Sequence, residues 1–399
     1  MNLIRCLHIG DDTEASHRMA ETETDAAGIH SLRSRALHFT LKIERMDPQT
    51  ASLLTQEMHL LGGASALNGR DQERRAESTD VLLMGTQEQF EELNARLVEH
   101  SRLRPLSSLL TETLKNISKK KHSIRCRKRT FPLGERTLLM GILNITPDSF
   151  SDGGLYFDRE KAIAQGVSMA EDGADILDIG GESTRPGSKP LAFEEELRRV
   201  IPVIESLVKK VDIPVSIDTY KSSVAQRAIE AGAEMINDIS GLNFDPGLAH
   251  VAAREDLPLV LMHTRGTPET MQKDVHYESL FSEILLYLRE SIRRAESAGV
   301  NPDQIIIDPG VGFGKTLEHN LLIIKNLSEF SIFGKPILLG TSRKNFIGRI
   351  LNADTAHRLE GTLSSLAIAV FNGAHIIRCH DVLQARKTIA VADAIRLAE

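Results

Sequence analysis

Apolar and polar positions alternate in a regular order from about residue 136 to the end of the chain. Short apolar runs, each long enough for one buried strand, are separated by amphipathic segments with helical periodicity. The apolar runs lie at 138–145, 176–179, 214–217, 235–239, 259–262, 305–307, 337–339 and 376–377. The amphipathic segments lie at about 159–173, 193–210, 222–232, 246–255, 280–299, 317–328, 361–373 and 382–398. This alternation predicts βα units on a parallel sheet.

Eight strand–helix units over roughly 260 residues match the usual size of a TIM (β/α)8 barrel. A doubly wound open sheet is the competing fold, but it usually has fewer units and a Gly-rich phosphate loop after its first strand. The first run here is followed instead by Asn144 and a polar segment that reads Ile-Thr-Pro-Asp-Ser-Phe-Ser-Asp-Gly-Gly. We therefore predict an α/β protein with a barrel over residues 136–399.

The first third of the chain has a different pattern and predicts a small α+β domain over residues 1–118. Its first 30 residues or so are polar with little periodicity, so we expect this start to be loosely held. Asp47-Pro48 suits an N-cap followed by Pro at the first helical position. The predicted elements are a strand at 36–44, a helix at 48–61, a strand at 80–84 and helices at 87–98 and 106–117. No catalytic spacing is found in this domain, so its role stays open.

A basic segment separates the two patterns, with the sequence Lys-Lys-Lys-His-Ser-Ile-Arg-Cys-Arg-Lys-Arg at 119–129. Such a run suits a nucleic-acid or localisation patch, or a solvated linker between domains. No aromatic residues interleave with the charges, and the run lies where the composition changes. These two features favour a basic linker over residues 119–135.

The composition narrows the choice of partners and compartment. The net charge is −7, aromatic residues make up only 4% and Trp is absent, which argues against a surface for nucleic acid or anionic membrane. The three cysteines are scattered and form no disulfide framework. No apolar run reaches membrane-spanning length, and the N-terminus lacks the pattern of a signal peptide. We therefore expect a cytoplasmic protein without nucleic-acid or membrane partners.

Every predicted barrel strand is followed by polar or charged residues. In barrels of this kind the chemistry lies at the C-terminal ends of the strands. In strand order, the residues found there include Asn144, Asp178, Asp218, Asn237, His263, Asp308, Lys344 and Arg378. Helix capping explains some of them, but it does not readily explain polar residues at all eight ends. The sequence therefore predicts a site at this rim.

The last two strands contribute the cationic part of the rim. They are followed by Arg343 and Lys344, and by Arg378 and His380. Arg378 and His380 are two positions apart, so an extended chain points them to the same side. A guanidinium and an imidazolium that converge in this way suit a diphosphate, and this is the usual phosphate site of the barrel.

Carboxylates and an amide come from strands three, four and six, as Asp218, Asn237 and Asp308. A buried carboxylate needs a donor or a cation. A flat heterocycle with adjacent N–H groups would supply paired donors. The alternative is a set of internal salt bridges to Lys221, Arg185 or Lys344, and it stays open at this point.

Two other motifs do not fit their patterns. The segment from Gly310 to Thr316 resembles a P-loop, but position 309 is Pro where the pattern requires Gly. We interpret it as a flexible loop that lets the backbone approach a ligand. The histidines show no spacing typical of a metal site, so a structural zinc is not expected.

Several long motifs together resemble the dihydropteroate synthase family, and they cover the whole predicted barrel. They are Met140–Gly154, Asp178–Gly187, Ser216–Lys221, Ile236–Ser240, Asp308–Lys315, Ser342–Gly348 and Arg378–Val382. The resemblance implies a transferase that joins 4-aminobenzoate to the diphosphate ester of 6-hydroxymethyl-7,8-dihydropterin. Diphosphate leaves, and 7,8-dihydropteroate is formed for folate biosynthesis. The resemblance does not extend to the N-terminal third or to a second folate enzyme, and a homodimer is compatible with it.

The same resemblance implies a role for each matching residue. Asn144 would contact Mg²⁺, the implied cofactor. Asp218, Asn237, Asp308 and Lys344 would bind the pterin. Thr184, Arg378 and His380 would bind the diphosphate. Arg185, Pro186, Phe313 and Ser342 would line the 4-aminobenzoate pocket. Asp218, Lys344, Arg378 and His380 would be the catalytic residues.

The mechanism that we expect is a dissociative substitution without a protein nucleophile. Arg378 and His380, together with magnesium, would stabilise the leaving diphosphate, and Asp218 would stabilise the pterin cation. The loops 148–154 and 184–189 would close over the substrates and exclude water. Two alternatives remain at this point, a methyltetrahydrofolate–corrinoid methyltransferase and a noncatalytic pterin-binding protein. The methyltransferase has no diphosphate to bind, so the cationic rim argues against it.

Overall fold

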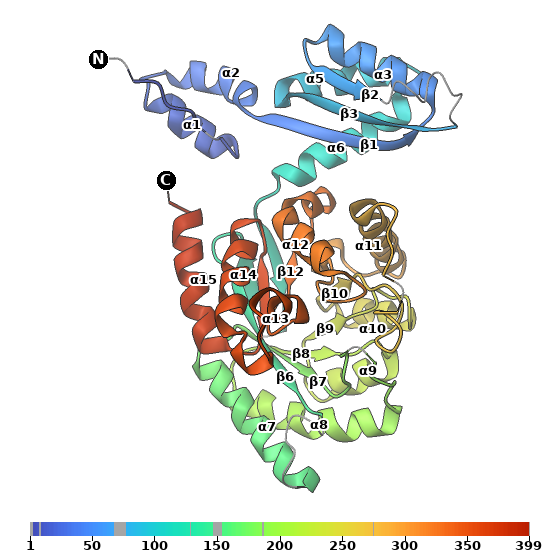
Figure 1. Cartoon of the computed structure of the whole chain (residues 1–399), viewed down its shortest axis with the longest axis vertical. Coiled ribbons are helices and arrows are strands. Elements are labelled where there is room, and N and C mark those ends of the chain that lie inside the picture. Colours follow the sequence, from blue (N-terminus) through green and yellow to red (C-terminus); the bar gives the residue numbers. More distant parts are fainter. Residues whose placement is uncertain are drawn as a thin grey trace. The chain divides into compact units, whose positions relative to one another are not determined.

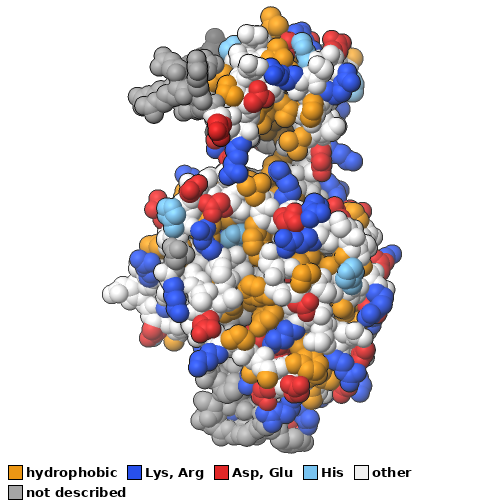
Figure 2. Space-filling model, turned by 90° about the vertical axis from the view of Figure 1, so that its right-hand side faces the viewer, with side chains coloured by type: hydrophobic (Ala, Val, Ile, Leu, Met, Phe, Trp, Pro, Cys, Tyr) orange, Lys and Arg blue, Asp and Glu red, His pale blue; other side chains and the backbone are white. Residues whose placement is uncertain are grey.

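The protein consists of two compact units, one that extends to Ser118 and one that spans Lys119–Ala398 (Figure 1). The computed structural model describes residues 3–7, 9–67, 77–127, 129–146, 154–185, 187–273 and 275–398. Positive and negative side chains are interspersed over the face shown in Figure 2. Within the described ranges, no helix combines the length and the apolar character needed to cross a membrane.

The first unit is a three-stranded antiparallel sheet, in the order β1-β3-β2, with helices packed against it. Its elements are α1 (Asp12–Ala20), α2 (Ala26–Ala36), β1 (His38–Met46), α3 (Pro48–Leu60), β2 (Ala64–Leu67), β3 (Thr79–Thr86), α5 (Gln87–Glu99) and α6 (Arg104–Ser118). Its own core is built from large buried side chains such as Leu54, Met58, Leu83 and Phe90. This unit therefore has the layered α+β organisation that the pattern predicts.

The prediction for the start of this unit was wrong in part, because α1 and the beginning of α2 lie in the segment that we expected to be loosely held. Both helices begin at an aspartate cap. The Asp11 carboxylate accepts hydrogen bonds from the backbone N–H groups of Thr13 and Glu14, and the Asp25 carboxylate accepts one from Gly28. These caps satisfy N–H groups that a short polar helix leaves open. The short strand β2 was also missed.

The second unit contains eight parallel strands that form a TIM-like barrel, which confirms the predicted fold class. The strands are β6 (Leu138–Asn144), β7 (Ile176–Gly180), β8 (Val215–Asp218), β9 (Met235–Asp238), β10 (Leu259–Met262), β11 (Ile305–Asp308), β12 (Leu338–Leu339) and β13 (Ile376–Cys379). Their order is β11-β10-β9-β8-β7-β6-β13-β12. An isolated parallel bridge between Ile307 and Ile337 links the two ends of this order.

The helices surround the strands on the outside. They are α7 (Gly154–Glu171), α8 (Phe193–Lys210), α9 (Ser222–Glu230), α10 (Gly247–Glu255), α11 (Leu280–Ser297), α12 (Leu317–Lys325), α13 (Asn345–Leu351), α14 (Leu359–Phe371) and α15 (Val382–Arg396). The sequence did not predict α13. Gly173, Gly232 and Gly373 follow their helices at positive φ, which is a common way for a helix to end.

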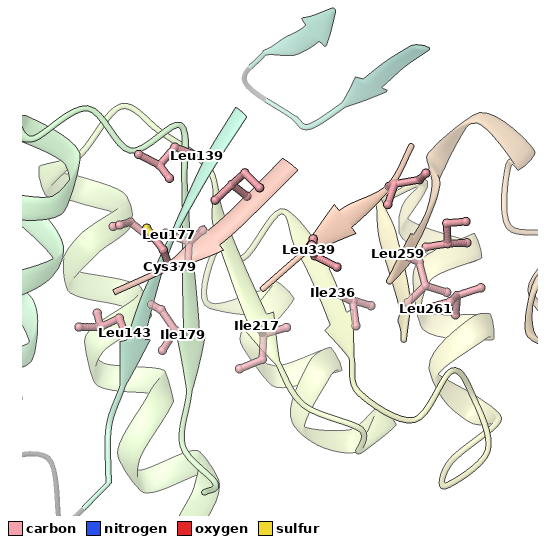
Figure 3. Packing of buried hydrophobic residues seen from close by; sticks show 14 of the residues in the cluster. Leu139, Leu143, Leu177, Ile179, Ile217, Ile236, Leu259, Leu261, Leu339 and Cys379 are labelled. Atoms are coloured by element: carbon pink, nitrogen blue, oxygen red, sulfur yellow. The ribbon is translucent and has the colours of Figure 1, made fainter. Parts of the chain in front are cut away.

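Each barrel strand divides its side chains between two faces. Alternate residues, such as Leu139, Leu177 and Ile217, point outward and pack with the helices in one large core (Figure 3). The residues between them point inward, and at the N-terminal ends of the strands these are apolar. Because side chains alternate along a strand, every second residue further along also points inward. This alternation directs the side chains of Asn144 and Asp218 into the barrel.

The basic segment is not a free linker, so that prediction was wrong. Much of it forms a hairpin of β4 (His122–Arg125) and β5 (Thr130–Leu133) that belongs to the barrel unit. Its apolar residues Ile124, Phe131 and Leu133 are buried against the inward-facing residues that begin the barrel strands. The hairpin therefore seals the N-terminal end of the barrel.

The positive charges of this segment pair with acidic side chains on the barrel. Arg127 lies 3.0 Å from Glu255, Arg129 lies 2.8 Å from Asp212, and Arg125 contacts Asp256. Alternation in the first half of the hairpin explains why this segment was misread, because the buried Ile124 and Cys126 alternate with the exposed Arg125 and Arg127.

Candidate active site

A cavity of about 1030 Å³ lies at the C-terminal ends of the barrel strands. Eleven of the twelve residues predicted to form a site line it. They are Asn144, Thr184, Arg185, Asp218, Asn237, Asp308, Phe313, Ser342, Lys344, Arg378 and His380. The remaining one, Pro186, lies outside the described residues, as does much of the predicted closing loop 148–154. The structure therefore brings together residues that are far apart in the sequence.

Arg378 is the centre of a buried ion network in this cavity. Its Nε donates to Asp178 Oδ2 and its Nη2 donates to Asp218 Oδ2, both at 2.6 Å. The Asn237 amide also donates to Asp178 Oδ2, at 2.9 Å. The cationic and acidic parts of the rim are therefore joined directly. The salt-bridge alternative was right that Asp218 has an internal cation, but that cation is Arg378 rather than Lys221, Arg185 or Lys344.

Burial dominates the electrostatics of the two carboxylates. It raises the pKa of Asp308 to about 6, although the backbone N–H of Gly310 donates to this carboxylate at 2.7 Å. The pKa of Asp218 is also raised, because the effect of burial and of the neighbouring Asp178 exceeds that of Arg378. Burial has removed the water that would donate hydrogen bonds to these two carboxylates, so a ligand with N–H donors can replace those hydrogen bonds.

Lys344 and Phe313 form a second pair beside this network. The Lys344 ammonium lies 4.1 Å from the centre of the Phe313 ring, which is a cation–π geometry. Burial and the proximity of Arg378 lower the pKa of Lys344 to about 8. The lysine therefore offers a charge that few water molecules screen.

The surroundings of His380 favour a neutral imidazole, whereas the sequence pattern suggested an imidazolium at this position. Burial and the neighbouring cations Arg378 and Arg343 lower its pKa to about 3. Its Nδ1 lies 2.9 Å from the hydroxyl of Ser342, and its backbone N–H donates to the same oxygen. His380 can therefore orient Ser342 and donate a hydrogen bond, but it brings no positive charge.

The glycine-rich loop after β11 is tightly packed, which corrects its interpretation as a flexible loop. Gly310, Gly312 and Gly314 all have positive φ. A Cβ on Gly310 would lie 1.9 Å from the carbonyl oxygen of His263, so only glycine fits there. The buried ammonium of Lys315 lies 2.8 Å from His263 Nδ1 and donates to the Phe313 carbonyl at 3.0 Å. These contacts fix the loop that carries Phe313.

Some cavity residues were not predicted as site residues. Ile239, Met262 and Met271 form an apolar wall together with Phe313. Arg349 and Arg358 stand at the edge near α13. Apolar residues at strand ends look like ordinary core, and α13 carries too short a pattern to detect. Met262 could have been predicted as a cavity residue only from the alternation along β10, which directs its side chain into the barrel.

Oxygen ligands for a hard cation converge beside Gly180. A Cβ on this glycine would lie 3.5 Å from Asp218 Oδ2 and 3.6 Å from Asn144 Oδ1. Among the described residues, no group of three or more His, Cys, Asp or Glu side chains could hold a metal ion. Protein amide and carboxylate oxygens suit Mg²⁺, which often takes its remaining ligands from a substrate phosphate and from water. The donor set thus fits a cation that arrives with a diphosphate.

Comparisons with known proteins agree with this geometry. A family model described as "Pterin binding enzyme" matches residues 140–380. The chain is 47% identical to the dihydropteroate synthase of Synechocystis sp. over 266 residues, which cover 66% of this chain and 92% of that protein. It also superimposes on a structure of the Xanthomonas albilineans dihydropteroate synthase in complex with 7,8-dihydropteroate. That match has a TM-score of 0.63 and 39% identity, and covers 69% of this chain and 100% of that one.

A third relative extends beyond the barrel. The chain is 37% identical over 390 residues to a probable bifunctional folylpolyglutamate synthase/dihydropteroate synthase of Halobacterium salinarum. The match covers 96% of this chain but only 46% of that protein. The N-terminal unit therefore has a counterpart there, whereas the Synechocystis protein matches a stretch about as long as the barrel.

Proposed function

This chain belongs to the pterin-binding enzyme family and, within it, to the dihydropteroate synthases, and we propose that the rim cavity is its catalytic centre. The reaction joins 4-aminobenzoate to 6-hydroxymethyl-7,8-dihydropterin diphosphate, giving 7,8-dihydropteroate and diphosphate. One observation carries the assignment to this cavity. The same cavity is lined by the carboxylates of Asp218 and Asp308, by amide side chains, by several cationic side chains and by an apolar wall.

We propose that the pterin ring binds at Asp218, Asn237, Asp308 and Lys344. The ring carries adjacent N–H donors and acceptors, and these four side chains supply the complementary groups. Carboxylates with raised pKa values gain most from paired donors, because burial has removed their water. The apolar wall that includes Met262 offers a flat surface for the face of the ring.

The diphosphate would lie toward Arg378, His380 and Thr184. Arg378 donates to two carboxylates, each at 2.6 Å. A pterin whose N–H groups bind Asp218 would free one N–H group of Arg378, which could then bind the departing diphosphate. His380, as a neutral imidazole, would contribute a hydrogen bond. Bound Mg²⁺, with Asn144 as its protein ligand, would neutralise charge on the diphosphate.

The aminobenzoate would occupy the side of the cavity formed by Arg185, Pro186, Phe313 and Ser342. Arg185 is exposed at the cavity edge and can meet a carboxylate, while the Phe313 ring can pack on an aromatic ring. This placement would leave the amine directed toward the pterin. Ser342 is held by His380 at 2.9 Å, so its hydroxyl has a defined direction.

The chemical step would then be a dissociative substitution. The bond between the exocyclic carbon of the pterin and the diphosphate oxygen breaks, and the electron pair leaves with the diphosphate. Asp218 stabilises the positive charge on the pterin, and Arg378 and Lys344 stabilise the negative charge that develops. The amine of 4-aminobenzoate attacks the carbon and releases one proton. No side chain has to act as a nucleophile.

The methyltransferase and the noncatalytic binder are not favoured, because the relatives described above are dihydropteroate synthases. A direct test is to supply the full chain with the pterin diphosphate and Mg²⁺, with and without 4-aminobenzoate, and to measure diphosphate and dihydropteroate. We expect both products to appear together and to depend on 4-aminobenzoate. A chain that released no diphosphate under either condition would contradict the proposal.

We also propose that the enzyme is a cytoplasmic homodimer. Its cysteines are free, as a reducing compartment requires. An apolar surface on α14 and α15, formed by Ile368, Phe371, Val391 and Ile395, is between 52% and 62% exposed per residue. A second copy could bury this surface. Analytical ultracentrifugation of the wild type and of Phe371→Glu should give a dimer and a monomer, and a monomeric wild type would refute the assembly.

A further inference from the structure

A buried ion cluster lies beside the cavity and outside its lining. The Lys221 ammonium donates to Glu182 Oε2 and to Glu196 Oε2, each at 2.5 Å, and to the carbonyl oxygen of Leu191 at 2.7 Å. These three hydrogen bonds use all the donors that an ammonium has. The side chains are well shielded, with exposed fractions of 18% for Lys221, 8% for Glu182 and 1% for Glu196.

The carboxylates are completed by the two residues that precede Lys221. Tyr220 donates its hydroxyl to Glu182 Oε1 at 2.9 Å, and Thr219 donates its hydroxyl to Glu196 Oε1 at 2.8 Å. Both oxygens of both carboxylates therefore have a partner. Three successive residues at the end of β8 hold two carboxylates from a different part of the chain.

The cluster joins the two ends of one loop. Glu182 follows β7 directly, whereas Leu191 and Glu196 lie at the start of α8. The segment between them carries Thr184 and Arg185, which line the cavity. Among the contacts of the described residues, the loop has two other ties to different elements. Arg199 on α8 donates to the Gly181 carbonyl at 2.9 Å, and the Gly187 backbone N–H donates to Pro268 at 2.9 Å. Lys221 therefore fixes both stems of this loop.

Lys221 also lies close in the sequence to the pterin-site carboxylate Asp218. Asp218 lies three positions before Lys221, at the end of β8, where it contacts Arg378. Buried ion pairs contribute little net stability compared with apolar residues of the same size, because the loss of hydration is costly. A cluster of two carboxylates and one ammonium is therefore better explained by the geometry that it imposes.

We propose that Lys221 is a positioning residue that holds the two stems of the Thr184–Arg185 loop at fixed places relative to Asp218. Through this residue the aminobenzoate side of the cavity is tied to the strand that carries the pterin carboxylate. Lys221 does not touch either substrate in this arrangement. The assignment of one side of the cavity to 4-aminobenzoate and the other to the pterin rests on the proposed function. The link between the loop stems and β8 rests on the contacts alone.

The test compares Lys221→Met with a matched control, Lys335→Met. The Lys335 ammonium also contacts one carboxylate and one carbonyl, those of Glu296 and Pro302, but it precedes β12 at the opposite end of the barrel. In Lys221→Met we expect the KM for 4-aminobenzoate to rise about tenfold or more, and the KM for the pterin diphosphate to change less than about threefold. Lys335→Met should leave both constants near those of the wild type.

Hydrogen–deuterium exchange of the substrate-free proteins gives a readout that does not depend on activity. Peptides that cover residues 183–191 should exchange faster in Lys221→Met than in the wild type and in Lys335→Met. Equal exchange in all three proteins, or a parallel rise of both KM values, would overturn the proposal. A wild type that fails to turn over would refute the proposed function, and the exchange measurement would then decide the tethering alone.

Two further variants cover the case in which Lys221→Met does not fold. Glu182→Gln keeps the size of the side chain and weakens the contact to the ammonium, so it should shift the KM for 4-aminobenzoate in the same direction by a smaller factor. Lys221→Arg keeps the charge, so the exchange of residues 183–191 in this variant should stay closer to that of the wild type than in Glu182→Gln. An unchanged KM in a folded Glu182→Gln would contradict the proposed role of the cluster.

Discussion

The two ends of the barrel are built from the same strands but have opposite chemistry. At the N-terminal end, inward-facing residues such as Leu138, Ile176 and Ile376 pack against Phe131 of the hairpin in a dry apolar layer. At the C-terminal end, inward-facing positions on the same strands hold Asp178 and Arg378 in an ion network. One strand thus passes from an apolar seal to a charged cavity within a few residues.

This difference separates stability from function along the barrel axis. Apolar burial at the sealed end stabilises the fold by about 25 cal/mol for each Å² removed from water. Charges at the open end lose hydration, and their mutual attraction offsets that loss only in part. We therefore expect substitutions at the open end to reduce activity, and substitutions at the sealed end to reduce stability.

The largest expected effect is on activity, from Asp218→Asn at the open end. The amide keeps the shape but removes the charge that faces the pterin cation, so kcat/KM should fall by about 10²–10⁴-fold. The free energy of unfolding should fall by less than the roughly 3–5 kcal/mol that is typical of breaking a buried ion pair, because Arg378 keeps Asp178 as its second carboxylate partner. Coupled assays of diphosphate release and urea unfolding measure both. Full retention of turnover would remove the role assigned to Asp218.

At the sealed end, Phe131→Ala should have the reverse effect. This ring is almost fully buried in the hairpin layer, and its removal should lower the free energy of unfolding by about 3–5 kcal/mol. The site residues are unchanged, so kcat/KM below the unfolding transition should stay within about threefold of the wild type. Urea unfolding and initial-rate assays on the same preparation test the comparison. A large loss of activity in a folded variant would show that the two ends are coupled.

The sealed end should also be sensitive to acid. His122 and His375 meet edge to face with ring centroids 4.9 Å apart, and burial lowers their pKa values to about 4 and about 3. His375 Nδ1 accepts a hydrogen bond from the backbone N–H of Ile337, which requires the neutral ring.

Below pH 6.5 the unfolded chain binds more protons at these two histidines than the folded chain does. Stability is therefore fully present above pH 6.5 and falls as the pH is lowered toward the folded-state values. Each histidine should contribute a loss of up to about 1.4 kcal/mol per pH unit in this window. Urea unfolding of the wild type and of His375→Asn between pH 7 and pH 5 should show a shallower fall in the variant. Identical slopes would exclude His375 as a source.

The smallest expected effect concerns the N-terminal unit. It has its own buried core, and the Synechocystis enzyme matches a stretch about as long as the barrel. Deletion of residues 1–118 should therefore leave kcat and both KM values within about threefold. Steady-state kinetics of the shortened and full chains measure this. A soluble shortened chain without activity would show that the unit takes part in catalysis.

Much of the barrel could be predicted because periodicity is a local property. The strands at 176–179 and 259–262 and the helix at 193–210 lie within one residue of β7, β10 and α8. The hairpin could not be predicted in this way, because its basic residues face solvent and acidic partners that lie about 80 to 130 positions away. Charge density gave the wrong interpretation there, since burial depends on partners that a local pattern does not contain.

The sequence by itself determined which residues could meet, because the alternation of side chains along each strand aims Asn144, Asp218, Asp308 and Arg378 to one side. Only the tertiary structure decided how they meet. It gave Arg378 two carboxylate partners and left His380 neutral, since pairing and loss of hydration depend on neighbours from distant strands. The same holds for Lys221, whose partners lie 25 and 39 positions away and come within reach because β7 and β8 pair side by side.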